Sequence, residues 1–371
     1  MKKTFFLLLI SCSIFAQNVA KIDSGAINGA RYRILFPENW KGKLVMYAHG
    51  YEFMGSKPLQ SQNPDFGKRM SPFLERGYAV AASDYQFQGF ALSQGVDDTE
   101  ALRQYFVVKY GKPDSTFMVG HSMGGGITLA MMENFGENYA GAFPMCPLSS
   151  RPYLQCRKEF DIYATFNGLF PNVVTSLADI FDLSKPYQPQ NVRNMFARAN
   201  EIKVAIFRKD SLLALAFAKR FDLKIDDLPM SLFFNENVLR DIAQKAKGNP
   251  FDNINTLYSG FPNDLEVNQK AERLSATVNP NDIFSKYDRT GNINKPIMAM
   301  HTIYDQLIPP TYGIVNFENM VHQQNKDEYF TVKFTNGQGH CNFTSKQTGK
   351  TFDELRNWVK TGIKAKAGFI E

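Results

Sequence analysis

The chain has 371 residues, of which 44% are hydrophobic and 21% charged, so it is long enough to bury one large core, alone or with a large insertion. Its formal net charge of +6 is a mild excess without a run of basic residues interleaved with aromatics, which argues against a nucleic-acid-binding protein. Beyond the N-terminus no stretch reaches the ~18 apolar residues of a membrane span. Because no cysteine or histidine spacing is typical of a metal site, we expect no bound metal and no cofactor.

The N-terminal segment is typical of a secretory signal peptide. Two lysines precede a short apolar run at residues 4–10, and Ala16 is the small residue expected before the cleavage site. Removal of residues 1–16 lowers the formal net charge to +4, because both lysines are lost and no acid is. Residues 9–12 also resemble a bacterial lipobox, in which Cys12 becomes a lipidated first residue. The apolar run before Cys12 is very short, so we favour soluble export, to the periplasm or the medium, over a lipid anchor.

Strand and helix signals alternate through the first part of the chain. The pair Asn28-Gly29 marks a hairpin turn between two N-terminal strands, and Gly111 is expected to end a helix that Asp97-Asp98 caps. Further strands are expected at 43–48, 78–84, 115–119 and 140–146, and further helices at 66–76 and 127–135. This alternation predicts a mostly parallel sheet that helices cover on both faces.

The alternation stops in the middle of the chain. Between residues 151 and 294 no buried strand is evident, and apolar residues recur at helical spacing around 166–181 and 238–246. We expect this segment to be a helical insertion that caps the rest of the molecule. The alternative is that its apolar faces simply pack on the main sheet.

Strand signals return after residue 295. Apolar strands are expected at 296–301 and at 329–334, the latter as the last strand, and a helix ending at Gly362 closes the chain. The expected division of the chain is a signal peptide at 1–16, a core at 17–150 and 295–371, and a helical insertion at 151–294.

Residues 120–124 read Gly-His-Ser-Met-Gly, between an expected strand and an expected helix. A Gly-x-Ser-x-Gly pattern in this setting is typical of a nucleophile elbow, a turn so sharp that side chains two residues before or after the serine collide with neighbouring backbone. Gly120 and Gly124 remove those side chains. The pattern therefore predicts that Ser122 is a nucleophile; the alternative is a glycine-rich loop at the end of an ordinary strand.

Two later residues complete a series with Ser122. Asp305 follows the strand expected at 296–301, and His340 follows the strand expected at 329–334. The order serine, aspartate, histidine, each just after a strand, resembles the α/β-hydrolase family, and the resemblance covers roughly residues 43–150 and 295–362. It implies a mostly parallel central sheet with helices on both faces, on which these three residues meet at the carboxyl ends of the strands.

The resemblance also implies a role for each residue. Ser122 would attack the substrate, His340 would take its proton, and Asp305 would orient the imidazole. The backbone N–H of Met123, the residue after the nucleophile, is expected to bind the developing oxyanion. By resemblance to the family's His-Gly motif, the backbone of Tyr51 would supply the second donor.

Other polar residues are weaker candidates. Asp84 also follows a strand, but its position before the elbow departs from the order of the family. His49 is expected to support the oxyanion loop, and His121 is the variable residue of the elbow. We expect no chemical role for His301 or His322.

The predicted function is that of an exported serine hydrolase acting on carboxylic esters, small or polymeric, through an acyl-enzyme. One alternative is an exported serine peptidase resembling the prolyl aminopeptidases, which would need a carboxylate pair to hold the substrate amine. The clearest acidic pair in the insertion is Asp226-Asp227, with Lys224 close enough to offset part of its charge. A further alternative is a binding protein that keeps the fold without catalysis, against which the intact serine, aspartate and histidine argue.

Three phenylalanines of the insertion, Phe166, Phe170 and Phe181, are expected to line the acyl pocket. The insertion falls between two strands of which the first ends at the catalytic edge, so it is expected to lie above Ser122 and exclude water. The alternative is that these rings form the packing core of the insertion.

Three cysteines remain after the signal peptide. Cys146 and Cys156 lie ten positions apart in a chain expected to be exported, and we predict a disulfide between them. The alternatives are two buried thiols, or Cys341 as the partner of either.

Overall fold

The computed structural model describes residues 19–185 and 192–371, so the expected signal peptide and Cys12 lie outside the described residues. The described chain contains one nine-stranded sheet with the strand order β1-β2-β4-β3-β5-β6-β7-β8-β9. β1 pairs antiparallel with β2 and β2 with β4, and every later pair in this order is parallel. The strands are β1 (Val19–Ile27), β2 (Ala30–Pro37), β3 (Lys43–Ala48), β4 (Tyr78–Ser83), β5 (Ser115–His121), β6 (Gly141–Met145), β7 (Ile297–Tyr304), β8 (Phe330–Gln338) and β9 (Gly368–Phe369).

The sheet confirms most of the expected strands. Asn28 and Gly29 turn the β1–β2 hairpin with φ angles of 49° and 89°, the left-handed region that such a turn requires. β3 spans the expected residues, and β4 and β6 are buried along their whole length, as continuous apolar runs in a sheet covered on both faces should be. The short parallel strand β9 follows β8 in the sheet, so the expectation that 329–334 is the last strand was wrong.

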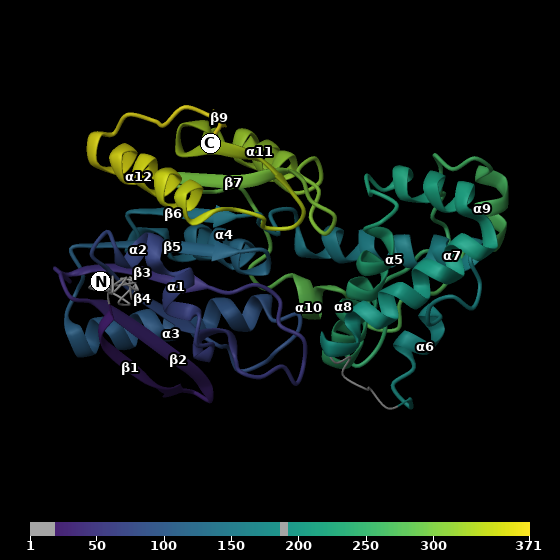
Figure 1. Ribbon diagram of the computed structural model, residues 1–371, viewed down its shortest axis with the longest axis horizontal. Coiled ribbons are helices and arrows are strands. Elements are labelled where there is room, and N and C mark those ends of the chain that lie inside the picture. Colours follow the sequence, from purple (N-terminus) through teal and green to yellow (C-terminus); the bar gives the residue numbers. More distant parts are fainter. Residues whose placement is uncertain (1–18, 186–191) are drawn as a thin grey trace, which may run out of the picture.

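Helices of the core cover both faces of the sheet (Figure 1). The side chains of α1, α2 and α12 pack into the apolar cluster on one face, and those of α3, α4 and α11 pack into the cluster on the other. The core helices are α1 (Phe66–Arg69), α2 (Ser71–Leu74), α3 (Leu92–Tyr110), α4 (Met123–Phe135), α11 (Ile314–Gln323) and α12 (Ser345–Thr361), with short 3₁₀ turns η1 (Gln60–Gln62), η2 (Gly136–Asn138) and η3 (Asp327–Tyr329).

Two helices differ from their expected bounds. The helix expected at 66–76 is two short helices, because Pro72 begins a new turn and has no N–H with which to continue the first. α3 begins at Leu92, ahead of the expected cap at Asp97-Asp98. The carboxylate of Asp98 instead accepts hydrogen bonds from the backbone and side-chain nitrogens of Gln86, at 2.8 Å each, and so fixes the loop after β4.

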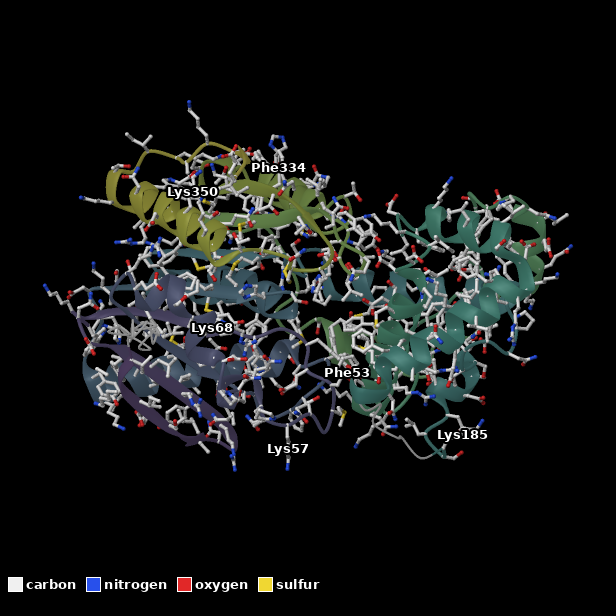
Figure 2. The ribbon with its side chains drawn as sticks, in the orientation of Figure 1. Phe53, Lys57, Lys68, Lys185, Phe334 and Lys350 are labelled. Carbon is white, nitrogen blue, oxygen red and sulfur yellow. A yellow bond between two sulfur atoms is a disulfide. The ribbon has the colours of Figure 1, made fainter. Side chains whose placement is uncertain are left out.

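Residues 151–185 and 192–294 contain six helices and no strand in the described chain. These helices lie together beyond one end of the sheet (Figure 1). Phe53, in the loop after β3, lies where they meet the core (Figure 2), with its ring 6.0 Å from that of Phe233. No helix in the described ranges is long and apolar enough to span a membrane. The six helices are α5 (Pro152–Leu169), α6 (Leu177–Phe181), α7 (Val192–Arg220), α8 (Leu228–Ala246), α9 (Asp264–Lys270) and α10 (Asn281–Phe284).

Candidate active site

Ser122 sits in a strained turn between β5 and α4. Its φ and ψ are 58° and −123°, a conformation that side chains rarely adopt. A Cβ on Gly120 would lie 2.2 Å from the carbonyl oxygen of Gly124, and a Cβ on Gly124 would lie 2.1 Å from that of Ala48. Both contacts are far closer than atoms can approach, so glycine is required on each side of the serine. The Ser122 N–H donates to Met145 O at 2.9 Å, which ties the turn to β6.

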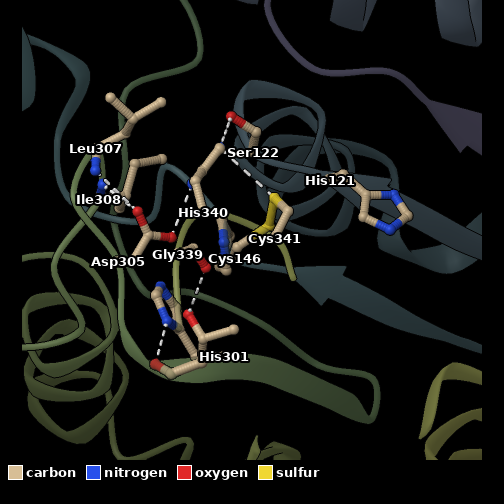
Figure 3. The surroundings of a disulfide bond; sticks show 12 residues. His121, Ser122, Cys146, His301, Asp305, Leu307, Ile308, Gly339, His340 and Cys341 are labelled. Carbon is tan, nitrogen blue, oxygen red and sulfur yellow. Dashed lines mark hydrogen bonds and ion pairs between the residues drawn. A yellow bond between two sulfur atoms is a disulfide. The ribbon is translucent and has the colours of Figure 1, made fainter. Parts of the chain in front are cut away.

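Asp305 and His340 meet Ser122 at the carboxyl ends of β5, β7 and β8 (Figure 3). His340 Nε2 lies 2.8 Å from Ser122 Oγ, and His340 Nδ1 lies 2.7 Å from Asp305 Oδ2. The other carboxylate oxygen of Asp305 accepts the backbone N–H groups of Leu307 and Ile308 at 2.9 Å each. The carboxylate of Asp305 therefore fixes the imidazole of His340, whose Nε2 faces the hydroxyl of Ser122.

The charge of Asp305 is stabilised although the side chain is buried. Burial raises the pKa of this carboxyl, but the neighbouring His340 and the N–H of Ile308 lower it more, so the net shift is below its ordinary value. An ionised Asp305 accepts the Nδ1–H of His340 and leaves Nε2 as the acceptor that faces Ser122. The backbone N–H of His340 donates to Gln306 Oε1 at 2.9 Å, which adds a second attachment for the same loop.

Two backbone segments flank Ser122, the first turn of α4 and the loop after β3. α4 begins at Met123, so the N–H groups of its first turn have no partner within the helix. The loop after β3 passes close by, because a Cβ on Gly50 would lie 3.2 Å from Ser122 Cβ. Tyr51 follows directly, and its hydroxyl donates to Asp241 Oδ2 of α8 at 2.6 Å, which joins the loop to the helical segment.

A small cavity of about 30 Å³ lies beside Ser122 and is covered by α5 and α8. Apart from Ser122, its lining is mostly apolar, with two polar side chains, Gln155 and Glu159, contributed by α5. Sequence reasoning missed both, because α5 carries other charged and polar side chains and nothing in its sequence singles these two out. The apolar lining residues are Tyr51, Phe90, Met123, Leu148, Cys156, Phe234, Val238, Leu307 and Ile308.

The three phenylalanines expected to line the pocket are not among these residues. Phe166 stacks on Phe170 with ring centroids 5.0 Å apart, and Phe181 packs on Phe251 at 6.1 Å, inside the helical segment. Phe166 lies seven positions beyond Glu159, which is about 10 Å of helix rise further from the cavity. The structure therefore favours the packing alternative for these rings.

The expected disulfide between Cys146 and Cys156 was wrong. Cys146 is bonded to Cys341, 195 positions away, with a Cα–Cα distance of 5.4 Å, and Cys156 is a buried free thiol. Cys146 directly follows β6, at the edge of the sheet where the loop after β8 also arrives, whereas Cys156 is already on α5. One sulfur of the bridge, Cys341 Sγ, lies 3.5 Å from His340 Nε2 (Figure 3).

The remaining candidates have structural partners. Asp84 accepts the backbone N–H and the hydroxyl of Ser61 at 2.6 and 2.7 Å. His49, at the start of the loop after β3, stacks on Tyr85 with ring centroids 4.0 Å apart. Burial lowers the pKa of His121 to about 4, which keeps this imidazole neutral.

Two histidines and the acidic pair lie outside the hydrogen-bonded series. His301 is buried with Nδ1 2.9 Å from Thr302 O, and His322 pairs with Asp327 at the surface. Asp226 pairs with Lys203 at 2.7 Å, and the carboxylate of Asp227 accepts the hydroxyl of Tyr304 at 2.6 Å. Neither member of the pair lines the cavity beside Ser122.

The strand order, the strained serine turn and the positions of Asp305 and His340 after two later parallel strands define the α/β-hydrolase fold. No protein-family model matches the sequence. An o-phthalyl amidase of Xanthobacter agilis is 20% identical over an alignment 405 positions long. The alignment covers 90% of this chain and 86% of that protein.

Solved structures resemble the chain weakly. An esterase of Pyrococcus furiosus is 11% identical with a TM-score of 0.47, over 92% of this chain and 94% of that one. Brefeldin A esterase, a bacterial homologue of human hormone sensitive lipase, is 12% identical with a TM-score of 0.47, over 96% and 79% of the two chains. The fold is defined by the order of the strands and by the positions of Ser122, Asp305 and His340 at their carboxyl ends.

Proposed function

We propose that the protein is a serine hydrolase that cleaves carboxylic esters through a covalent acyl-enzyme. The observation that carries the proposal is the continuous hydrogen-bonded series from Ser122 Oγ through His340 to Asp305. A serine hydroxyl is a weak nucleophile until a base within hydrogen-bond reach takes its proton, and 2.8 Å is within that reach. Asp305 keeps the imidazole in the tautomer that accepts the proton and stabilises the imidazolium.

The proposed reaction has two half-reactions. Ser122 Oγ attacks the ester carbonyl while its proton passes to His340 Nε2, and the N–H groups of Met123 and Tyr51 bind the oxyanion. The carbon–oxygen bond to the alcohol then breaks, and the leaving oxygen takes the proton from His340. In the second half-reaction water gives a proton to His340 and attacks the acyl carbon. The bond to Ser122 Oγ then breaks, and Oγ takes the proton back from His340, which releases the acid and restores Ser122.

The surroundings of Ser122 support an acyl-binding pocket. The lining of the cavity is mostly apolar, as is usual for small-molecule sites, and α5 and α8 cover it. At about 30 Å³ the cavity admits an acyl group only when these helices move apart. We propose that the helical segment acts as a cap, which excludes water during acylation and contacts the acyl group.

Hydrolysis of an amide or peptide bond is the second candidate. The same serine chemistry cleaves amides, and the relative at 20% identity is named an amidase. The pair Asp226-Asp227 gives no support to an aminopeptidase, because both carboxylates have other partners and lie outside the cavity.

A fluorophosphonate probe tests the proposal directly. We expect stoichiometric labelling of Ser122 in the purified chain, abolished in Ser122→Ala and strongly slowed in His340→Asn. Turnover of p-nitrophenyl butyrate against an aminoacyl p-nitroanilide then separates ester from amide cleavage. An unlabelled Ser122 in folded protein would refute the serine mechanism and support a non-catalytic binding protein.

We also propose that the protein is exported. The pattern in residues 1–16 supports this, and a disulfide is typical of oxidising compartments. The mass of the mature N-terminus is the test. A chain that begins at Gln17 supports soluble export, a lipidated Cys12 supports an anchored lipoprotein, and an intact Met1 would contradict both.

A further inference from the structure

Glu159 and Gln155 place two buried acceptor atoms at the cavity beside Ser122. Only 7% of Glu159 and 1% of Gln155 is exposed, and both side chains line the cavity. Glu159 Oε2 and Gln155 Oε1 have no hydrogen-bond partner among the described residues. Both atoms come from α5 at positions four apart, so they lie on the same face of one helix.

The other atoms of these two side chains are held in place. Gln155 Nε2 donates to Glu159 Oε1 and to Leu307 O, at 3.4 Å each, so its amide oxygen is turned away from both. The two acceptors are therefore oriented before any substrate arrives. A buried acceptor left without a donor is costly, so a ligand that supplies one gains more than a hydrogen bond formed in water would provide.

The surroundings favour a donor over a purely apolar group. Burial raises the pKa of Glu159 to about 7, and the smaller effects of Gln155 and Lys158 lower it. The side chain is therefore ionised in a substantial fraction of the molecules near neutral pH. Lys158, the neighbouring cation, lies with its ammonium over the ring of Tyr312 at 5.3 Å. An apolar acyl chain would leave both oxygens unpaired, whereas an N–H group would pair with them.

We propose that Glu159 and Gln155 recognise an N–H donor carried by the acyl part of the substrate. The proposal rests on the serine hydrolase function proposed above and narrows its substrate class to N-acylamino or amino acyl groups. The acyl part is favoured over the alcohol because it stays bonded to Ser122 through both half-reactions, so a covered cavity suits it.

A matched pair of esters isolates the N–H group. The acyl parts of p-nitrophenyl N-acetylglycinate and p-nitrophenyl levulinate have the same number of non-hydrogen atoms in the same order, and N–H in the first is replaced by CH₂ in the second. The ratio of their kcat/KM values is measured for the wild type, Glu159→Leu and Glu159→Gln, and again with the pair lengthened by one methylene. Comparing this ratio between variants cancels the difference in intrinsic reactivity of the esters. Val238→Ala is the matched control, because Val238 lines the same cavity without a polar atom.

We expect Glu159→Leu to lower the N–H to CH₂ ratio about tenfold or more in at least one pair, as loss of a hydrogen bond to a charged group does. Glu159→Gln should lower it less, because a carbonyl acceptor remains, and Val238→Ala should leave it within about threefold. A ratio that is the same in the wild type and Glu159→Leu for both pairs overturns the proposal, since the acceptors are then satisfied by water alone.

A binding measurement keeps the test decisive if Glu159→Leu does not fold. N-acetylglycinamide and levulinamide are compared for protection of Ser122 from the fluorophosphonate probe in the wild type and in Glu159→Gln. The proposal is supported if N-acetylglycinamide protects Ser122 better than levulinamide in the wild type and this difference is smaller in Glu159→Gln. It is overturned if the two compounds protect Ser122 equally in both proteins. Labelling of Ser122 without any N–H preference refutes only the recognition site, whereas absence of labelling refutes the hydrolase function itself.

Discussion

The bond between Cys146 and Cys341 should stabilise the chain and the position of His340 together. The two residues are 195 positions apart, and the chain-entropy model gives about 5 kcal/mol for closing a loop of this length, an upper value because native geometry and residual denatured structure reduce it. Removal of both sulfurs in Cys146→Ala/Cys341→Ala should therefore lower the free energy of unfolding by a few kcal/mol. Because Cys341 follows His340 directly, kcat should also fall, with a smaller effect on KM.

Chemical unfolding monitored by circular dichroism measures the first effect, and turnover of p-nitrophenyl butyrate measures the second. Cys156→Ala is the control for the stability measurement, because it removes a buried free thiol and leaves the bridge intact. It should cost about 1 kcal/mol, as a small buried truncation usually does. Unchanged stability and unchanged kcat in the double variant would refute the reasoning, as would peptide mapping that finds Cys146 bonded to Cys156.

Three further predictions concern single side chains. Ser122→Ala should lower kcat by ~10⁴–10⁶ without changing the circular dichroism spectrum; retention of a tenth of the activity would contradict this. Phe166→Ala should lower the free energy of unfolding by ~3–5 kcal/mol and leave the preference between short and long acyl esters unchanged, and a changed preference would restore the pocket role of this ring. Because the pKa of Glu159 is raised on folding, from 4.5 to about 7, this group stabilises the protein below its unfolded pKa and loses that contribution as pH rises through about 7. The free energy of unfolding in urea should therefore differ between pH 5 and pH 8 by less in Glu159→Gln than in the wild type, with the reduction on the order of 3 kcal/mol. Equal differences in the two proteins would exclude this role.

The parts of the fold that sequence reasoning found are those with a local physical cause. Continuous apolar runs such as 43–48 predict buried strands because every side chain must be covered. Ser122, Asp305 and His340 were expected to meet because the carboxyl ends of parallel strands share one edge, whatever lies between them in the chain. Gly120 and Gly124 were expected for a steric reason that the backbone contacts bear out.

The parts that it missed depend on distances in space. Helical spacing identified an apolar face at Phe166, but it does not say whether substrate or protein covers that face. Nearness in sequence favoured Cys156 over Cys341, although the topology of the sheet brings the distant cysteine to the end of β6. Asp98 was expected to cap a helix because an aspartate carboxylate can accept a backbone N–H. It does accept one, but that N–H is from Gln86, in the loop before the helix.

The bridge between Cys146 and Cys341 encloses the whole helical segment in one covalent ring. A protease that cuts one peptide bond anywhere between these cysteines leaves Ser122 in one fragment and His340 in the other, still joined by a covalent bond. The nicked protein should therefore run as two bands on a gel only after reduction. A cut in the helical segment therefore does not separate Ser122 from His340, because the bridge still joins the two fragments.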